Sequence, residues 1–213
     1  AIWNKEDSAG KIGLLHRICT VEPRHPSFKI EGRRAGLIDV TARPTAGSCR
    51  DMPSPITIRA ARQDDMPVLG AFGTQLTALH HQWDPTRFIA AGAGTKASYG
   101  RWLHSQLEEP DVVVLTAEQE NAIVGYAYAS REGYDYMALR GPAGVIHDLF
   151  VDPERRNQGI GRMLLDAAVA ELRKRGAGLV VLSTAHRNEA AQRLFATAGF
   201  RPTMVEMALD DKA

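Results

Sequence analysis

The residues with the clearest chemical potential form a glycine-containing turn, Arg156-Asn157-Gln158-Gly159-Ile160-Gly161. This turn follows an apolar, strand-like run at 145–151 and opens a stretch with helical spacing of apolar residues. A strand that leads into a helix N-terminus presents free backbone N–H groups and the positive end of the helix dipole, which together bind phosphate. Glycines have no Cβ, so the backbone can approach a bulky anion closely. We therefore predict a phosphate-binding turn at 156–161.

Two common phosphate-binding motifs do not match this turn. The dinucleotide fingerprint G-x-G-x-x-G fails, because a pattern that starts at Gly159 ends on Leu164. The nucleotide P-loop fails, because no Gly-Lys-Ser/Thr sequence occurs in the chain. The remaining pattern is R-x-x-G-x-G after a strand that ends in Val151-Asp152-Pro153. In that context it resembles the acetyl-CoA pyrophosphate loop of the GNAT superfamily of N-acetyltransferases.

A second segment, downstream of the turn, strengthens this resemblance. Asn188 opens a helical stretch, Phe195 lies near its end, and Gly199-Phe200 follows. The run at 179–184 between the two motifs has the apolar, β-branched content of a buried strand. The resemblance extends from about Ile56 to Leu209.

The elements that must position these motifs follow an α/β order. Strands are predicted at 56–59, 111–117, 122–130, 145–151, 179–184 and 202–209, and helices at 63–79, at 96–107, after 160 and after 188. This order predicts a mixed sheet. The resemblance implies a GNAT-like, mostly antiparallel sheet with a splayed central parallel pair, 145–151 and 179–184, and with helices on both faces.

The resemblance also implies a place for the co-substrate. Acetyl-CoA would bind where the two parallel strands part, with main-chain groups of Phe150 and Val151 on the pantetheine arm and on the thioester carbonyl. The loop that wraps the pyrophosphate would consist of Arg156, Asn157, Gln158, Gly159, Ile160 and Gly161. Asn188 would either hydrogen-bond the pantetheine or only cap its helix. No Cys, His and Asp cluster has zinc-ligand spacing, so no metal is predicted.

The implied reaction is direct attack of an amine on the thioester, which needs a proton acceptor. Several family members have a glutamate on the strand that matches 145–151 and a tyrosine on the last helix. Here His147 occupies the glutamate position with Asp148 beside it, and Phe195 occupies the tyrosine position. Histidine is a credible base because its ordinary pKa lies near 6.5, although it can also be a structural residue at the strand edge.

Phe195 cannot donate a proton, so we expect it to pack in the core or against the cofactor. The thiolate would then leave unprotonated or take its proton from water. Weaker candidates for the acid are Tyr134, Tyr136 and Ser183. Contacts to the acceptor are expected from Trp83, Asp84, Arg87 and Phe88, because in many relatives the segment between the first two helices lines the acceptor pocket. Tyr134, in the loop before the 145–151 strand, is a further candidate.

These features predict an acetyl-CoA-dependent N-acetyltransferase that uses a primary amine in a ternary complex. The alternatives are a peptide or protein N-terminal acetyltransferase and, because of Phe195, an inactive acyl-CoA-binding sensor. The partner would be a small-molecule or peptide amine, and the protein a monomer or homodimer. The scattered charge and the absence of a long apolar run argue against nucleic-acid and membrane partners.

Residues 1–51 differ in composition from the rest of the chain. They are rich in Gly, Pro, Arg and Ser and hold nine Lys and Arg against six Asp and Glu. The first methionine is Met52. Our hypothesis is a disordered or non-native extension at 1–51 that precedes a GNAT domain at 52–213. With two cysteines, and no signal-like segment, the expected compartment is the cytoplasm.

Overall fold

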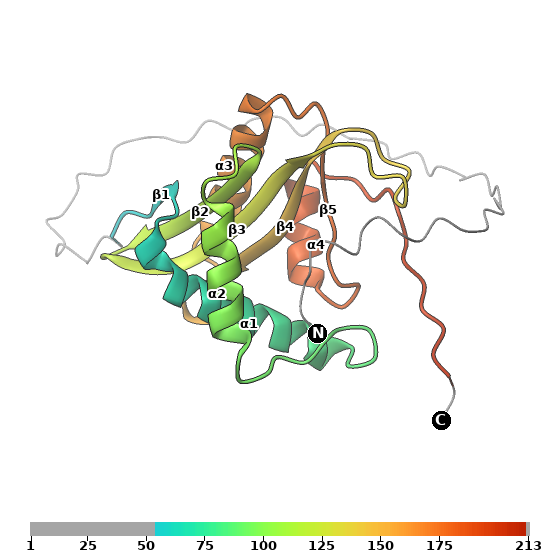
Figure 1. Cartoon of the computed structure of the whole chain (residues 1–213), viewed down its shortest axis with the longest axis horizontal. Coiled ribbons are helices and arrows are strands. Elements are labelled where there is room, and N and C mark those ends of the chain that lie inside the picture. The colour runs from blue at the N-terminus through green and yellow to red at the C-terminus, as the bar shows by residue number, and fades with distance from the viewer. Residues whose placement is uncertain (1–53, 212–213) are drawn as a thin grey trace, which may run out of the picture. The chain divides into compact units, whose positions relative to one another are not determined.

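A five-stranded mixed sheet organises the part of the chain that the computed structural model describes, residues 54–211 (Figure 1). The strands lie in chain order, and their bounds are β1 Thr57–Ala60, β2 Val112–Gln119, β3 Ala122–Glu132, β4 Ala143–Val151 and β5 Val180–Leu182. Neighbours from β1 to β4 are antiparallel, and β4 pairs with β5 in parallel. The predicted α/β class with a mixed, mostly antiparallel sheet is confirmed.

Helices cover both faces of this sheet (Figure 1). On one face, α1 (Met66–Trp83) and α2 (Thr95–Gln106) contribute Leu69, Phe72 and Leu103 to a core that includes Tyr126 and Phe150. On the other face lie α3 (Ile160–Lys174) and α4 (Glu189–Thr197). Short 3-10 turns at Gln63–Asp65 and Pro153–Arg155 precede α1 and α3.

The helix α3 shows why this pattern folds as it does. Its buried side chains recur at helical spacing and form one apolar stripe against the sheet, made of Ile160, Leu164, Leu165, Ala168 and Leu172. Burial of such a stripe removes apolar surface from water, which stabilises the packed helix. The first residue of the stripe, Ile160, fixes the start of α3 directly after the glycine turn.

An extra residue in β4 changes the direction of the side chains that follow it. Tyr128 pairs with Asp148 and the next residue, Ala129, pairs with Ile146, so His147 has no partner in β3. This β-bulge breaks the alternation of the strand. As a result, Ile146 and Leu149 pack on the α3 side, whereas His147 and Asp148 both contact side chains of the α1–α2 side.

The parallel pair separates soon after it forms. Three residues of β4, Gly144 to Ile146, pair with Val180 to Leu182 of β5. Beyond Ile146, β4 continues to Val151, whereas β5 ends. The observed strand, Val180–Leu182, is shorter than the predicted strand at 179–184, because the residues after Leu182 do not pair with β4. The bulge and the end of the pairing coincide, which opens the sheet beside His147.

One predicted element, the strand at 202–209, is wrong. Residues 201–211 are exposed and belong to no strand, and within the described residues no backbone hydrogen bond joins them to β5. The alternation of Val205, Met207 and Leu209 is typical of a strand, but a strand also needs a partner for its backbone groups. In consequence the parallel pair lies at the end of the sheet rather than in its centre. The predicted extension at 1–51 lies outside the described residues.

Candidate active site

A cavity of about 250 Å³ lies where β4 and β5 part. Its walls come from both strands, from the end of α1 with the segment that follows it, and from α4. The lining residues are Leu76, Thr77, His80, Phe88, Ile89, Ile146, His147, Asp148, Leu149, Leu182, Ser183, Thr184, Asn188, Ala191 and Phe195. The predicted residues His147, Asp148, Phe88, Asn188 and Phe195 are therefore brought together. Apolar walls with a few convergent polar groups are typical of small-molecule sites.

His147 is held by a stacked ring and by two polar groups from β3. Its imidazole lies against Tyr128, with ring centroids 4.9 Å apart and an interplanar angle of 27°. Nε2 lies 2.9 Å from Ser130 Oγ and 3.0 Å from Glu132 Oε1. Burial lowers the pKa of His147 below its ordinary 6.5, and this effect exceeds the opposing influence of Glu132. The ring is therefore neutral at pH 7 and able to accept a proton.

Asp148 lies next to His147 in a different environment. The hydroxyl groups of Tyr99 and Tyr126 both donate to its Oδ2. Burial nevertheless raises the pKa of Asp148 to about 7. Tyr99 reaches this position because Gly73 on α1 makes room for it: a Cβ on Gly73 would lie 2.3 Å from the Tyr99 ring. The cavity thus contains a second group that changes its protonation near neutral pH.

The predicted phosphate-binding turn has the backbone that such a site needs. Asn157 and Gly159 both adopt positive φ, at 62° and 80°. No side chain caps the N-terminus of α3, so its first N–H groups point away from the helix without a side-chain partner. Arg156 folds back over the turn, where its Nε donates to the carbonyl of Val151 at 3.2 Å. The turn can therefore accept an anion through its backbone, with a guanidinium group close by.

Asn188 and Phe195 occupy structural positions at the cavity wall. The Asn188 side chain accepts a hydrogen bond from the backbone N–H of Ala191 at 3.2 Å, which caps α4. Phe195 is buried and packs against Phe200, with centroids 6.1 Å apart. Capping is thus the role of Asn188 that is visible in the structure, and Phe195 is part of the α3–α4 core.

The five residues expected to contact the acceptor have different surroundings. Phe88 lines the cavity and contacts the His80 ring, with centroids 5.0 Å apart. Asp84 accepts hydrogen bonds from the backbone N–H groups of Thr86 and Arg87, so it stabilises the turn after α1. The Arg87 guanidinium forms an ion pair with Glu206.

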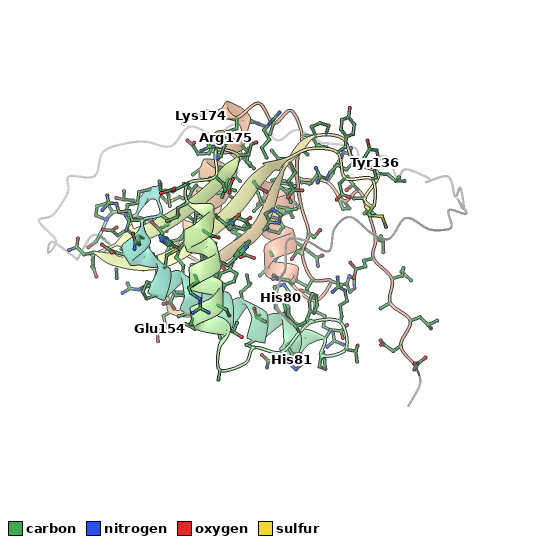
Figure 2. All side chains as sticks on the ribbon, in the orientation of Figure 1. His80, His81, Tyr136, Glu154, Lys174 and Arg175 are labelled. Carbon is green, nitrogen blue, oxygen red and sulfur yellow. The ribbon has the colours of Figure 1, made fainter. Side chains whose placement is uncertain are left out.

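The remaining two candidates also lie outside the cavity lining. Trp83 packs edge-on against His80, at 5.1 Å between centroids, and its carbonyl accepts from Arg187. Tyr134 is 70% exposed and stacks on Tyr136 in the loop between β3 and β4, where Figure 2 shows Tyr136. Of the five, only Phe88 lines the cavity.

Several polar residues of the site were not predicted. Glu132, Tyr99 and Tyr126 contact the two candidate catalytic side chains, and Thr77 and His80 line the cavity. Nδ1 of His80 donates to the carbonyl of Leu76 at 2.8 Å, and the cavity lining thus includes a second imidazole, at the end of α1 (Figure 2). The spacing of Ser130 and Glu132, two residues apart on one strand, is a signal for a shared face. The other contacts join elements far apart in the chain.

None of the helices in 54–211 is both long enough and apolar enough to cross a membrane. Within the same residues, no three His, Cys, Asp or Glu side chains are grouped so that they could hold a metal ion.

Comparison with known proteins gives a consistent family. A family model described as the acetyltransferase (GNAT) family matches residues 76–200. The chain is 38% identical over 149 residues to the mycothiol acetyltransferase of Thermobispora bispora, covering 63% of this chain and 49% of that protein. It is 31% identical over 94 residues to an L-methionine sulfoximine/L-methionine sulfone acetyltransferase of Salmonella typhimurium, covering 42% and 51%. The chain thus spans about half the length of these two curated relatives.

Solved structures share the fold. An aminoglycoside N-acetyltransferase in complex with CoA superposes with a TM-score of 0.58 at 17% identity, covering 76% of this chain and 98% of that one. An acetyltransferase from Clostridium acetobutylicum, solved with acetyl-CoA, gives a TM-score of 0.57 at 20% identity and covers 73% and 96%. At these identities the likeness concerns the fold alone.

Proposed function

This chain belongs to the acetyltransferase (GNAT) family, and from that premise we propose that it is an acetyl-CoA-dependent N-acetyltransferase. The acceptor would be a primary amine that attacks directly in a ternary complex. The observation that carries the proposal is the cavity at the parting of β4 and β5, which contains a neutral imidazole, His147, and is followed along the chain by the uncapped N-terminus of α3.

The turn at 156–161 fits the pyrophosphate of acetyl-CoA. Gly159 and Gly161 present no side chain to an approaching anion, and a Cβ at Gly159 would meet no atom within 4 Å, so the space above the turn is open. Arg156 can turn from the Val151 carbonyl to a phosphate oxygen pair. The pantetheine arm would then follow the backbone at Phe150 and Val151 toward the cavity, as in the family.

The chemistry assigns different roles to the two neighbouring side chains. The amine nitrogen attacks the thioester carbonyl, a C–N bond forms and the C–S bond breaks, and His147 accepts the proton that the nitrogen loses. Asp148, when ionised, stabilises the positive charge that develops on His147. Phe195 cannot donate a proton, so the thiolate leaves as such or is protonated by water.

The size and lining of the cavity favour a small acceptor. About 250 Å³ accommodates a short amine-bearing group, and Leu76, Phe88 and Ile89 offer it apolar contacts. The relatives' names point the same way, since they refer to mycothiol and to L-methionine sulfoximine. We therefore propose a small-molecule amine, with a peptide α-amine as the alternative acceptor.

Thiol release tests the proposal. The protein is incubated with acetyl-CoA and a panel of amino acids, amino sugars, polyamines and short peptides, and free CoA is measured together with the mass of the product. We expect thiol release and a product heavier by one acetyl group with at least one small amine. Release with peptides alone would favour the alternative acceptor. Tight acetyl-CoA binding without release from any amine would favour an acyl-CoA sensor.

A further inference from the structure

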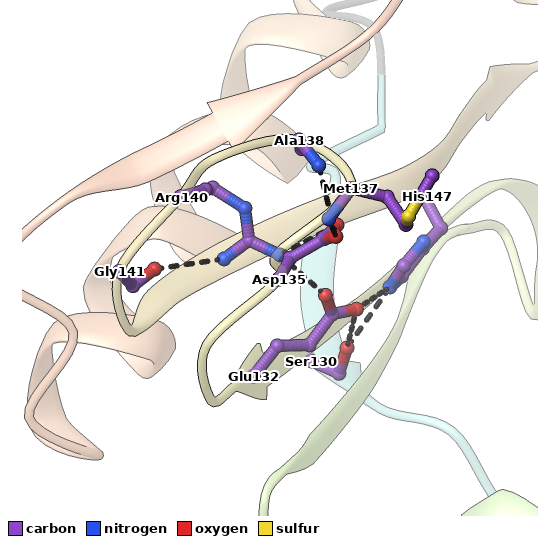
Figure 3. Close-up of polar contacts among 8 residues, drawn as sticks. All are labelled: Ser130, Glu132, Asp135, Met137, Ala138, Arg140, Gly141 and His147. Atoms are coloured by element: carbon purple, nitrogen blue, oxygen red, sulfur yellow. Dashed lines mark hydrogen bonds and ion pairs between the residues drawn. The ribbon is translucent and has the colours of Figure 1, made fainter. Parts of the chain in front are cut away.

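We propose that Glu132 and Arg140 are positioning residues for His147, such that Glu132 fixes the proton on Nε2 and leaves Nδ1 as the nitrogen that accepts the substrate proton. Arg140 holds Glu132 in place and adds to the effect of burial, which favours the neutral imidazole. The inference rests on the proposed acetyl transfer, in which His147 is the base. It concerns a network between the end of β3 and the loop 133–142 that the sequence did not reveal (Figure 3).

The position of the ring proton follows from the chemistry of the neighbours. The Glu132 carboxylate can only accept hydrogen bonds, and its Oε1 lies 3.0 Å from Nε2 of His147. A lone pair on Nε2 would repel that oxygen, so Nε2 carries the hydrogen. Ser130 supports this assignment, because its hydroxyl donates to the same Oε1 at 3.1 Å and leaves its oxygen free to accept from Nε2. In the neutral ring, Nδ1 is then the basic nitrogen.

Packing on one face of the ring opposes a flip that would exchange its two nitrogens. The imidazole stacks on Tyr128, whose own ring packs edge-on against Trp102 with centroids 4.9 Å apart. Tyr128 is buried, so it cannot move aside at low cost. Within the described residues, Nδ1 of His147 has no hydrogen-bond partner.

Arg140 anchors the carboxylate from the other side. Its Nη2 lies 2.7 Å from Glu132 Oε2 and 3.7 Å from Asp135 Oδ2, and its side chain is only 12% exposed. The backbones of Asp135 and Arg140 exchange two hydrogen bonds of 2.8 Å, which ties the ends of the loop together. Glu132 therefore shares its charge between a guanidinium group and an imidazole.

Burial, with a smaller contribution from Arg140, explains how His147 is oriented by a carboxylate and yet favours the neutral form. Glu132 raises the pKa of His147, whereas burial and Arg140 lower it. The other charged or titratable groups nearby are Tyr128, which stacks on the ring, Asp148 and His80, which line the same cavity, and Asp135, which contacts Arg140. Without Arg140 the influence of Glu132 would be opposed by burial alone, and the pKa of His147 would rise toward its ordinary value.

The ring nitrogens can be observed directly by NMR in protein labelled with ¹⁵N-histidine, with His147→Gln used to assign the signals. In the parent protein we expect a neutral ring at pH 7 with the hydrogen on Nε2. Glu132→Gln should populate the other tautomer and lower the titration midpoint by about one pH unit. Arg140→Met should raise the midpoint by a smaller amount, because Arg140 acts on the ring only through its charge, and Arg140→Lys should restore it.

Activity provides the second readout. Glu132→Gln should lower kcat about tenfold with little change in the KM of the amine, because the ring is misoriented while the pocket is intact. The controls are Glu109→Gln and Lys174→Met, which replace an exposed acidic and an exposed basic side chain and should change neither readout. Melting curves identify any variant that fails to fold. If an Arg140 variant fails, the ring tautomer and the kcat of Glu132→Gln still test the proposal.

The two proposals fail in different ways. A tautomer and midpoint in Glu132→Gln that equal those of the parent would overturn the positioning role, even if acetyl transfer is observed. If the tautomer and the titration midpoint of His147 change as expected but no amine releases thiol, the positioning of His147 is supported and the acetyltransferase assignment is overturned instead.

Discussion

The hydroxyl group of Tyr126 donates to Oδ2 of Asp148 across 3.1 Å, from a ring that is fully buried. Tyr99, on α2, donates to the same oxygen, and the two hydroxyl oxygens lie 3.2 Å apart. Two donors favour the ionised carboxylate, but burial outweighs them, because the pKa of Asp148 is raised to about 7. The Asp148 carboxyl group is therefore a source of pH-dependent stability as well as a part of the cavity.

The first prediction concerns that stability. In the unfolded chain Asp148 ionises near 3.8, whereas in the folded protein it ionises near 7. Its favourable contribution is present below the lower value and is lost as the pH rises through the higher one. Asp148→Asn should remove this loss, so at pH 8 the variant should be more stable than the parent, by at most about 4 kcal/mol. Denaturant unfolding from pH 4 to pH 8 measures the difference.

The variant Asp64→Asn serves as the control, because Asp64 is exposed. It should follow the parent at every pH. If Asp148→Asn is equally destabilised at pH 4 and pH 8, the buried carboxyl group does not titrate in the proposed way.

The second prediction concerns His147 as the base. His147→Gln should lower kcat about 10²-fold and leave the affinity for acetyl-CoA nearly unchanged, because it removes the proton acceptor but not the cofactor loop. In the parent, kcat/KM should fall toward acid pH with a midpoint below 6.5, since burial lowers the pKa of His147. Asp148→Asn should keep this acid limb. A midpoint near 7 that disappears in Asp148→Asn would instead identify Asp148 as the base.

The third prediction separates the roles of two glycines in the phosphate-binding turn. Gly159 has φ of 80°, so Gly159→Ala should cost about 1 kcal/mol of stability and also weaken CoA binding. At Gly161 a Cβ would meet Leu194 and Val151 only at 3.4 and 3.7 Å, so Gly161→Ala should fold normally and weaken CoA binding alone. Thermal melts and calorimetric titration with CoA measure the two effects.

Gly176 offers a matched control for strain, because it has φ of 83° at the end of α3, away from the turn. Gly176→Ala should lower stability as Gly159→Ala does and leave CoA binding unchanged. Normal CoA affinity in Gly161→Ala would contradict the placement of the pyrophosphate at this turn.

The fourth prediction concerns the acceptor side. Phe88 lines the cavity beside His80, so Phe88→Ala should raise the KM of the amine about tenfold through lost apolar contact. The affinity for acetyl-CoA should stay the same. Val68→Ala, on the outer face of α1, is the control and should change neither value. An unchanged KM in Phe88→Ala would remove this segment from the acceptor pocket.

Local patterns were sufficient to predict most of the fold. The apolar stripe of α3 repeats with the helical period, and β2 and β3 are long, largely buried runs joined by a tight polar turn at 120–121, so both kinds of element are visible in one sequence. The segment 202–209 has apolar residues at alternating positions, Val205, Met207 and Leu209, but it is not a strand in the structure. Alternation indicates that a segment can form a strand, whereas the partner edge is a property of the folded chain.

The site was predictable only where one segment supplies it. The turn at 156–161 is one contiguous segment, and His147 and Asp148 are neighbours in the chain. The chemistry of each is therefore visible in the sequence. The partners of that pair, Glu132 and Tyr99, come from a neighbouring strand and a distant helix. Their distances depend on register and packing, which a single sequence does not display.

The bulge in β4 has a consequence for how the protein could lose or gain stability. Without His147, the residues from Ile146 to Val151 would alternate regularly between the two faces, and Asp148 would still stand opposite Tyr128. A deletion of this one codon would therefore restore a regular alternation in β4 and remove the proposed base at the same time. If His147 is the base, a regular strand and acetyl transfer place opposite requirements on a single position.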